Sequence, residues 1–179
     1  MNRMTLLSPL AAACIAAACT TMVAIPEALQ PGANSTLAMV VPAKGVQVYE
    51  CRARKGADGH EWVFVAPDAM LFDVRGHRIG HHGAGPFWQS SDGSRVVGSV
   101  KAKADAPDGS IPWLLLATKD AGPSGAFSRV TSIQRVNTVG GTTPAKPCTA
   151  AEAGQQARVP YTADYRFFTP SSLTTTANR

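Results

Sequence analysis

The stretch "FSRVTSIQRVNTV", residues 127–139, alternates its side chains as a β-strand does. Two sets of residues would lie on opposite faces, Val130, Ser132, Gln134 and Val136 on one and Arg129, Thr131, Ile133 and Arg135 on the other. A period of two is the signature of a strand. This period dominates the chain and is the main indication of its fold.

Further segments carry strand signals of the same kind. They are "VQVYECR" (46–52), "EWVFVA" (61–66), "SRVVGSVKAKA" (94–104) with Gly98 as a possible bulge, and "YTADYRFF" (161–168). In the last of these, Tyr161, Ala163, Tyr165 and Phe167 share a face. "IPWLLLAT" (111–118) is a continuous apolar run, which predicts a strand buried on both faces.

Only one short helix is expected, near residues 149–154. Thr149 and Glu152 have the capping-box spacing, in which a hydroxyl and a carboxylate each bind an unpaired N–H group. A parallel sheet would need crossover helices that this sequence lacks. The fold class is therefore predicted to be all-β, as an antiparallel β-sandwich or a barrel-like sandwich.

The domain organisation follows from composition along the chain. Residues 1–18 are predicted to be a signal peptide, 19–45 a linker and N-terminal segment, 46–168 a single β domain, and 169–179 a disordered tail. The net charge of +5 comes from scattered basic residues. Because no basic cluster is interleaved with aromatic residues, nucleic acid is not an expected partner.

The first residues indicate export. Arg3 precedes an uncharged, mostly apolar stretch that ends in Ala16-Ala17-Ala18, as signal peptides do. Cys19 follows these alanines and is a candidate for lipidation, although Ala16 stands where a lipobox usually has Leu or Val. Plain secretion and a lipid anchor at Cys19 remain alternatives, so the protein would be periplasmic, secreted or membrane-anchored, and an anchor would be its only membrane contact.

Export explains the cysteines. Once the leader is removed, Cys51 and Cys148 remain, and an oxidising compartment permits a disulfide between them. Two free buried thiols are the alternative. A redox motif is not expected, since the chain contains no C-x-x-C.

Three of the four histidines lie in "RGHRIGHHGAGPFWQSSDG", residues 75–93. Arg75-Gly76 and Asp92-Gly93 have the composition of hairpin turns, so the segment between them should contain a return strand. On a strand, His77 and His81 would be about 13 Å apart, too far to share one zinc ion. We therefore expect no metal, and the sequence contains no cofactor or catalytic motif, so its catalytic residues, if any, are unknown.

The residues that follow the histidines are the best binding candidates. In "HGAGPFW", His82, Phe87 and Trp88 could form a sugar-stacking site on a glycine-rich loop. Phe87 and Trp88 could instead alternate across a strand and fill the core. The favoured function is an envelope or extracellular module that binds a small molecule or glycan. The alternative is a small secreted enzyme that uses His82 with a carboxylate.

Several motifs occur together in one order: "VQVYEC", "WVFVAPDA", "AGPFW", "SDGSRVVG", "IPWLLL", "IQRVNTVGG" and "VPYTADY". Together they resemble an exported bacterial and fungal family catalogued as domain of unknown function 3455. The resemblance spans residues 46–168. It implies cysteines at the positions of Cys51 and Cys148 and a histidine at His82, and it implies no established activity.

Overall fold

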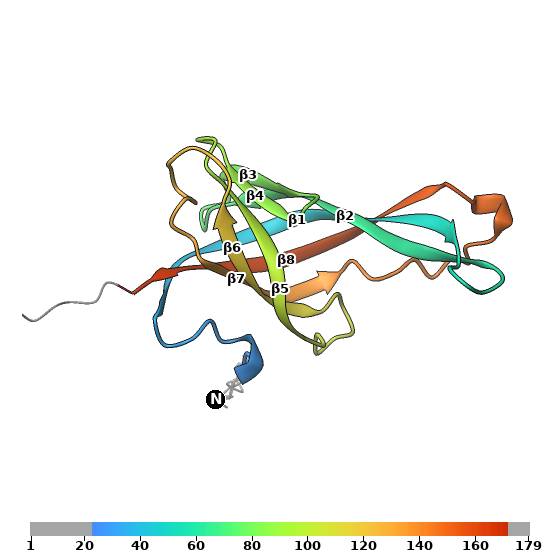
Figure 1. The fold of residues 1–179 in the computed structure, drawn as a ribbon, viewed down its shortest axis with the longest axis horizontal. Coiled ribbons are helices and arrows are strands. Elements are labelled where there is room, and N and C mark those ends of the chain that lie inside the picture. Colours follow the sequence, from blue (N-terminus) through green and yellow to red (C-terminus); the bar gives the residue numbers. More distant parts are fainter. Residues whose placement is uncertain (1–22, 172–179) are drawn as a thin grey trace, which may run out of the picture.

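The computed structural model describes residues 23–171, whose strands form a closed antiparallel barrel (Figure 1). The strands are β1 (Ser35–Ala53), β2 (His60–Phe72), β3 (Arg78–Gly83), β4 (Phe87–Ser90), β5 (Arg95–Ala104), β6 (Trp113–Asp120), β7 (Ser132–Gly140) and β8 (Gln156–Pro170). Each strand pairs with the next, and β8 also pairs with β1. The all-β prediction is confirmed, and the sheet takes the closed form.

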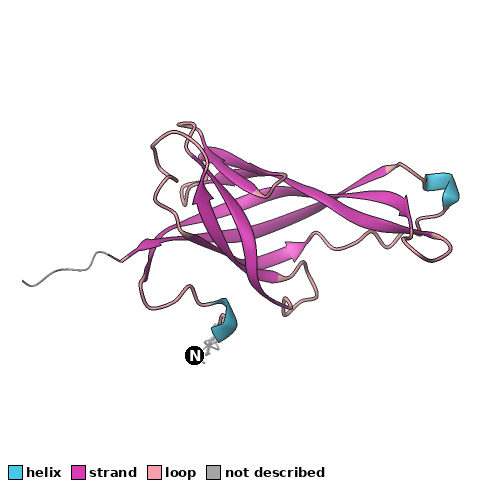
Figure 2. Cartoon of the chain, in the orientation of Figure 1, coloured by secondary structure: helices cyan, strands magenta, loops and turns pink. Residues whose placement is uncertain are grey.

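The helical elements among residues 23–171 are two short 3-10 turns, η1 (Glu27–Leu29) and η2 (Ala150–Glu152), which Figure 2 shows in cyan. The predicted capping box is present at η2. The Thr149 side chain accepts from the Ala151 N–H, and Glu152 accepts from the Thr149 N–H. Within residues 23–171, no helix has the length and apolarity needed to span a membrane.

The strands begin earlier and end later than the sequence indicated. Residues 35–45, which belong to the predicted linker and N-terminal segment, are the first half of β1, and β8 continues through Pro170. Proline is rare inside a sheet because it has no N–H to donate. Pro42 is accommodated in β1 because β1 pairs with β2 only from Ala43 onwards. The predicted signal peptide, Cys19 and most of the predicted tail lie outside the described residues.

The two hairpin turns expected at Arg75-Gly76 and Asp92-Gly93 are present. Gly76 and Gly93 have φ angles of 85° and 90° and lie in the turns that join β2 to β3 and β4 to β5. Gly98, in contrast, is not a bulge. It pairs with Thr118, and the register of β5 shifts further on, between Val100 and Ala102.

Alternation along the strands separates two clusters of buried side chains. The inner core fills the barrel and includes Ala69, Trp88, Leu116, Ile133, Tyr161, Ala163, Tyr165 and Phe167. The outer core consists of Leu29, Ala106, Trp113 and Val136. Leu29 of η1 covers the outer face of the barrel there, and its carbonyl accepts a 2.6 Å hydrogen bond from Gln134. Buried side chains therefore lie on both faces of β6 and β7, in agreement with the prediction for the 111–118 run.

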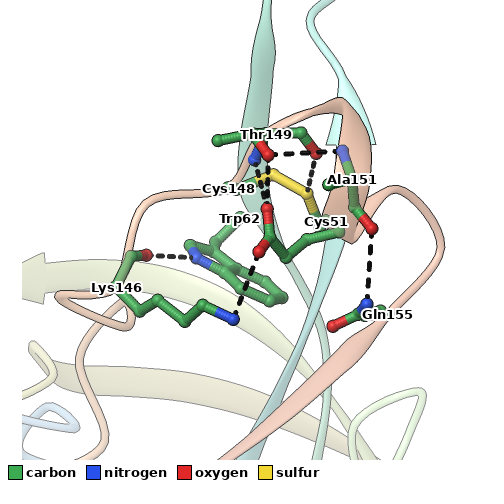
Figure 3. Close-up of polar contacts among 8 residues, drawn as sticks. Cys51, Trp62, Lys146, Cys148, Thr149, Ala151 and Gln155 are labelled. Atoms are coloured by element: carbon green, nitrogen blue, oxygen red, sulfur yellow. Dashed lines mark hydrogen bonds and ion pairs between the residues drawn. A yellow bond between two sulfur atoms is a disulfide. The ribbon is translucent and has the colours of Figure 1, made fainter.

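Beyond the barrel, β1, β2 and β8 continue as a narrow arm that carries η2 at its far end (Figure 1). The Cys51–Cys148 disulfide ties the segment after β7 to this arm, which confirms the predicted pairing. Figure 3 shows Trp62 beside the bridge, donating a 2.7 Å hydrogen bond to the carbonyl of Lys146. The Tyr49 hydroxyl also donates to the carbonyl of Gly141, so the segment is attached at both ends.

Candidate functional site

A pocket of about 410 Å³ is lined by residues from all eight strands and from the segments that precede β4 and β6. Its lining comes from separate parts of the chain: Gln47, Tyr49, Phe64, Val65, Pro67, His82, Gly85, Pro86, Trp88, Val100, Ile111, Pro112, Leu114, Leu116, Arg135 and Tyr165. Most of these side chains are apolar or aromatic. Such a volume and lining are typical of small-molecule sites.

Three of the lining residues are exposed apolar side chains, which we call the rim. Phe64 is 50%, Val65 39% and Val100 56% exposed. The Phe64 ring meets Tyr49 edge to face, with centroids 5.9 Å apart. Apolar groups are therefore exposed around the pocket as well as within it.

His82 lines the pocket and is only 3% exposed. Its ring stacks on Trp88 with centroids 4.3 Å apart. Nδ1 lies 2.7 Å from the Phe87 carbonyl and donates to it, so Nε2 carries no proton in the neutral ring. Burial lowers the pKa of His82 to about 3, although the carbonyl opposes this, and the nearby positive charge of Arg135 lowers it further. His82 is neutral at physiological pH.

The two aromatic candidates lie on opposite faces of β4. Trp88 is 1% exposed and lines the pocket from within the barrel. Phe87 is half-buried outside the pocket lining, between the His81 ring and the Arg95 guanidinium, which lies 3.9 Å from the ring centroid. The two residues alternate across the strand, and Trp88 has no open face on which a sugar could stack.

Arg135 is a charged residue of the pocket lining that the sequence analysis did not identify as a site residue. It is half-buried, and its Nε and Nη2 donate to the Pro112 carbonyl at 3.1 and 2.8 Å. The alternating pattern placed it on a face with Ile133 but could not show that this face points into the barrel. No carboxylate among the described residues forms an ion pair with it.

Gln47 and Tyr165 add polar groups to the same pocket. Gln47 is 2% exposed, and its Nε2 has no hydrogen-bond partner among residues 23–171. The Tyr165 hydroxyl lies 3.2 Å from that of Tyr161, and burial raises the pKa of Tyr165. Neither residue was singled out from the sequence as a site residue, because glutamine and tyrosine on a strand are common in cores and on surfaces alike.

No Asp or Glu lines the pocket. Among the described residues, the hydrogen-bond partner of His82 is the Phe87 carbonyl at Nδ1, and no carboxylate is hydrogen-bonded to the ring. Residues 23–171 also contain no group of three His, Cys, Asp or Glu side chains that could hold a metal ion.

The sequence matches the family model described as "Protein of unknown function (DUF3455)" over residues 31–169, which is more than half of the chain. The match covers every strand except the last residue of β8. Neither the curated proteins nor the solved structures include a match to this chain.

Proposed function

The chain belongs to the family described as protein of unknown function (DUF3455), and we propose that it binds a small, mainly apolar molecule in the pocket of its barrel. The pocket itself carries this proposal. It has the volume of a small-molecule site, and apolar side chains predominate from its rim to Leu116. An apolar occupant would remove this surface from water, at a gain of about 25 cal/mol per Å².

A glycan suits the lining less well. Sugar hydroxyls need hydrogen-bond partners when they are buried, and most of this lining cannot provide them. Trp88 also lacks the exposed ring face that sugar stacking uses, since His82 lies against it. A mainly apolar molecule is the better candidate.

We also propose that the protein acts outside the cytoplasm, in the periplasm or beyond it. The Cys51–Cys148 bridge supports this location, because structural disulfides persist in oxidising compartments. The composition of residues 1–18 and the position of Cys19 support export with or without a lipid anchor. Mass spectrometry of the protein isolated from its host tests this proposal, because an intact Met1 would contradict it.

Binding can be tested with N-phenyl-1-naphthylamine, a neutral apolar probe whose fluorescence rises when it leaves water. We expect saturable binding of one probe per chain, with quenching of Trp88, which lines the pocket. Leu114→Trp fills the pocket and should abolish this binding. Val139→Trp is the matched control, since Val139 is exposed and lies outside the pocket lining.

The variants need a check of folding, which their circular dichroism spectra and melting temperatures provide. If Leu114→Trp does not fold, competition between the probe and a second neutral apolar compound on the wild-type protein replaces it. Binding that never saturates would overturn the proposal, and so would a folded Leu114→Trp variant that binds the probe as well as the wild type does.

A further inference from the structure

The pocket contains one charge that no described residue neutralises. Arg135 is half-buried among mainly apolar neighbours, and its polar partners are neutral: it donates to the Pro112 carbonyl, and the Tyr165 hydroxyl lies within hydrogen-bonding reach. No Asp or Glu lies in the pocket lining, and no carboxylate among residues 23–171 forms an ion pair with Arg135. His82 does not add to the charge, because it is neutral. A partly desolvated cation without an anion is costly unless a bound group compensates it.

A second observation also indicates a ligand that accepts hydrogen bonds in this pocket. The Nε2 of Gln47 is a buried hydrogen-bond donor without a partner among the described residues, and Gln47 lines the same pocket as Arg135. Trp88 also lines the pocket, and its buried indole N–H has no hydrogen-bond partner among the described residues. Unpaired buried donors are rare in folded proteins because each one forfeits its hydrogen bond to water.

These groups restrict the chemistry of the ligand. The guanidinium of Arg135 uses Nε and Nη2 on Pro112 and has further N–H groups in its planar fork, a geometry that matches a carboxylate. A second anionic charge would have no second cation in the lining to meet it. The rest of the lining is mostly apolar and leads to the rim of Phe64, Val65 and Val100.

We infer that the pocket takes a small apolar acid, whose carboxylate binds Arg135 and accepts a hydrogen bond from Gln47, while its apolar body lies against the rim and the inner wall. This inference rests on the proposed function and adds the class of ligand to it. Arg135 supplies the charge, and Gln47 is a specificity residue, since an apolar group placed beside its amide would leave the donor unpaired.

The test compares two ligands that differ at the head group alone. Decanoate and 1-decanol are used to displace N-phenyl-1-naphthylamine from the wild-type protein near neutral pH, where the acid is ionised. We expect decanoate to bind more tightly than decanol by about tenfold or more, because charge-assisted hydrogen bonds are about twice as strong as neutral ones. Equal displacement by the two would overturn the inference and leave the proposed function in place. Failure of the neutral probe to bind would overturn both.

Arg135→Gln is the decisive variant, because it removes the charge and keeps hydrogen-bond donors. It should lose the preference for decanoate, measured as the ratio of the decanoate and decanol affinities of the same variant, because a change in the pocket that affects both ligands cancels in this ratio. Arg158→Gln removes a charge outside the pocket and should keep the preference. A preference for decanoate that survives in Arg135→Gln would contradict the assignment. If Arg135→Gln fails to bind the neutral probe, Arg135→Lys replaces it, and the preference should then persist in weakened form.

Gln47→Leu provides a readout that a purely structural role would not produce. The substitution removes an unpaired buried donor, so the empty protein should melt at a higher temperature than the wild type. The same variant should also have a smaller ratio of decanoate affinity to decanol affinity than the wild type has. A lower melting temperature together with unchanged decanoate binding would show that the amide serves the fold and not the ligand.

Discussion

His82 and Trp88 lie ring on ring inside the barrel, with centroids 4.3 Å apart and planes 15° from parallel. They are paired residues on β3 and β4, and the Nδ1 of His82 donates to the carbonyl of the neighbouring Phe87. A histidine in this position is a neutral aromatic packing element of the pocket wall. Because this buried ring is neutral when the protein is folded, the free energy of unfolding should depend on pH.

Burial lowers the pKa of folded His82 to about 3, whereas an unfolded histidine titrates near 6.5. Between these values the unfolded chain binds a proton that the folded chain excludes. The stabilisation by His82 is therefore complete above about pH 6.5 and is lost as the pH falls towards 3, by up to about 1.4 kcal/mol per pH unit. Urea unfolding of the wild type and His82→Gln should show a difference in stability that narrows on acidification. A difference that stays constant with pH would contradict the buried neutral state. His60→Gln is the control, because the His60 side chain forms no ion pair with any of residues 23–171.

Gly98 should resist substitution. A Cβ at this position would approach a ring carbon of Trp88 to 2.8 Å and a methyl group of Leu116 to 3.2 Å. Gly98→Ala should therefore destabilise the protein by about 1–3 kcal/mol and shift the fluorescence of Trp88, because both neighbours belong to the packed inner core. Ser99→Ala, at the adjacent exposed position, should change neither quantity. Equal stabilities for the two variants would mean that the Trp88 ring can move aside freely.

The disulfide should contribute a substantial part of the stability. Cys51 and Cys148 are separated by 97 positions, and a bridge across so long a loop restricts the unfolded chain by about 4–5 kcal/mol in the entropic model. Cys148→Ser should lower the free energy of unfolding by a few kcal/mol, and the double variant with Cys51→Ser should lower it by no more than that. Urea unfolding measures both, and non-reducing peptide mapping should recover the two cysteines in one linked fragment. Separately alkylated cysteines in the native protein would contradict the bridge.

Two Asp-Gly-Ser turns offer a matched comparison. Asp92 accepts hydrogen bonds from the N–H and hydroxyl of Ser94 and also from the N–H of Ala126, in the segment between β6 and β7. Asp108 accepts the same two bonds from Ser110 but binds no distant segment. Asp92→Ala should therefore release the Ala126 amide to hydrogen exchange, whereas Asp108→Ala should leave it protected.

The same hydrogen bonds lower the pKa of Asp92, those from Ser94 most of all. Its unfolded carboxyl has a pKa near 3.9, so the stabilisation it provides is present above that pH and is lost as the pH falls through the folded value. Protection of the Ala126 amide should decline on acidification in the wild type for this reason. Protection that is equal in Asp92→Ala and the wild type would show that the segment is held by Phe127 packing instead.

The amino-acid sequence by itself determined the local structure of this protein. The period of two predicted strands, Asp-Gly and Arg-Gly predicted the turns, and the spacing of Thr149 and Glu152 predicted the cap of η2, because each depends on side chains within a few residues of one another. The cysteine pairing could be predicted as well, since only Cys51 and Cys148 remained once the leader was set aside. The strand residues at 35–45 could not, because proline is unfavourable inside a sheet and Pro42 is accommodated by a pairing with β2 that begins only at Ala43.

Closure of the barrel and the composition of the pocket were decided by the tertiary structure alone. A period of two sorts side chains into two faces, but it cannot say which face will be enclosed, since that depends on the pairing of β8 with both β1 and β7. Arg135 and Gln134 are neighbours on β7, and either could have faced solvent. Closure directs Arg135 into the pocket, while Leu29, more than a hundred residues earlier in the chain, covers Gln134 on the outer face.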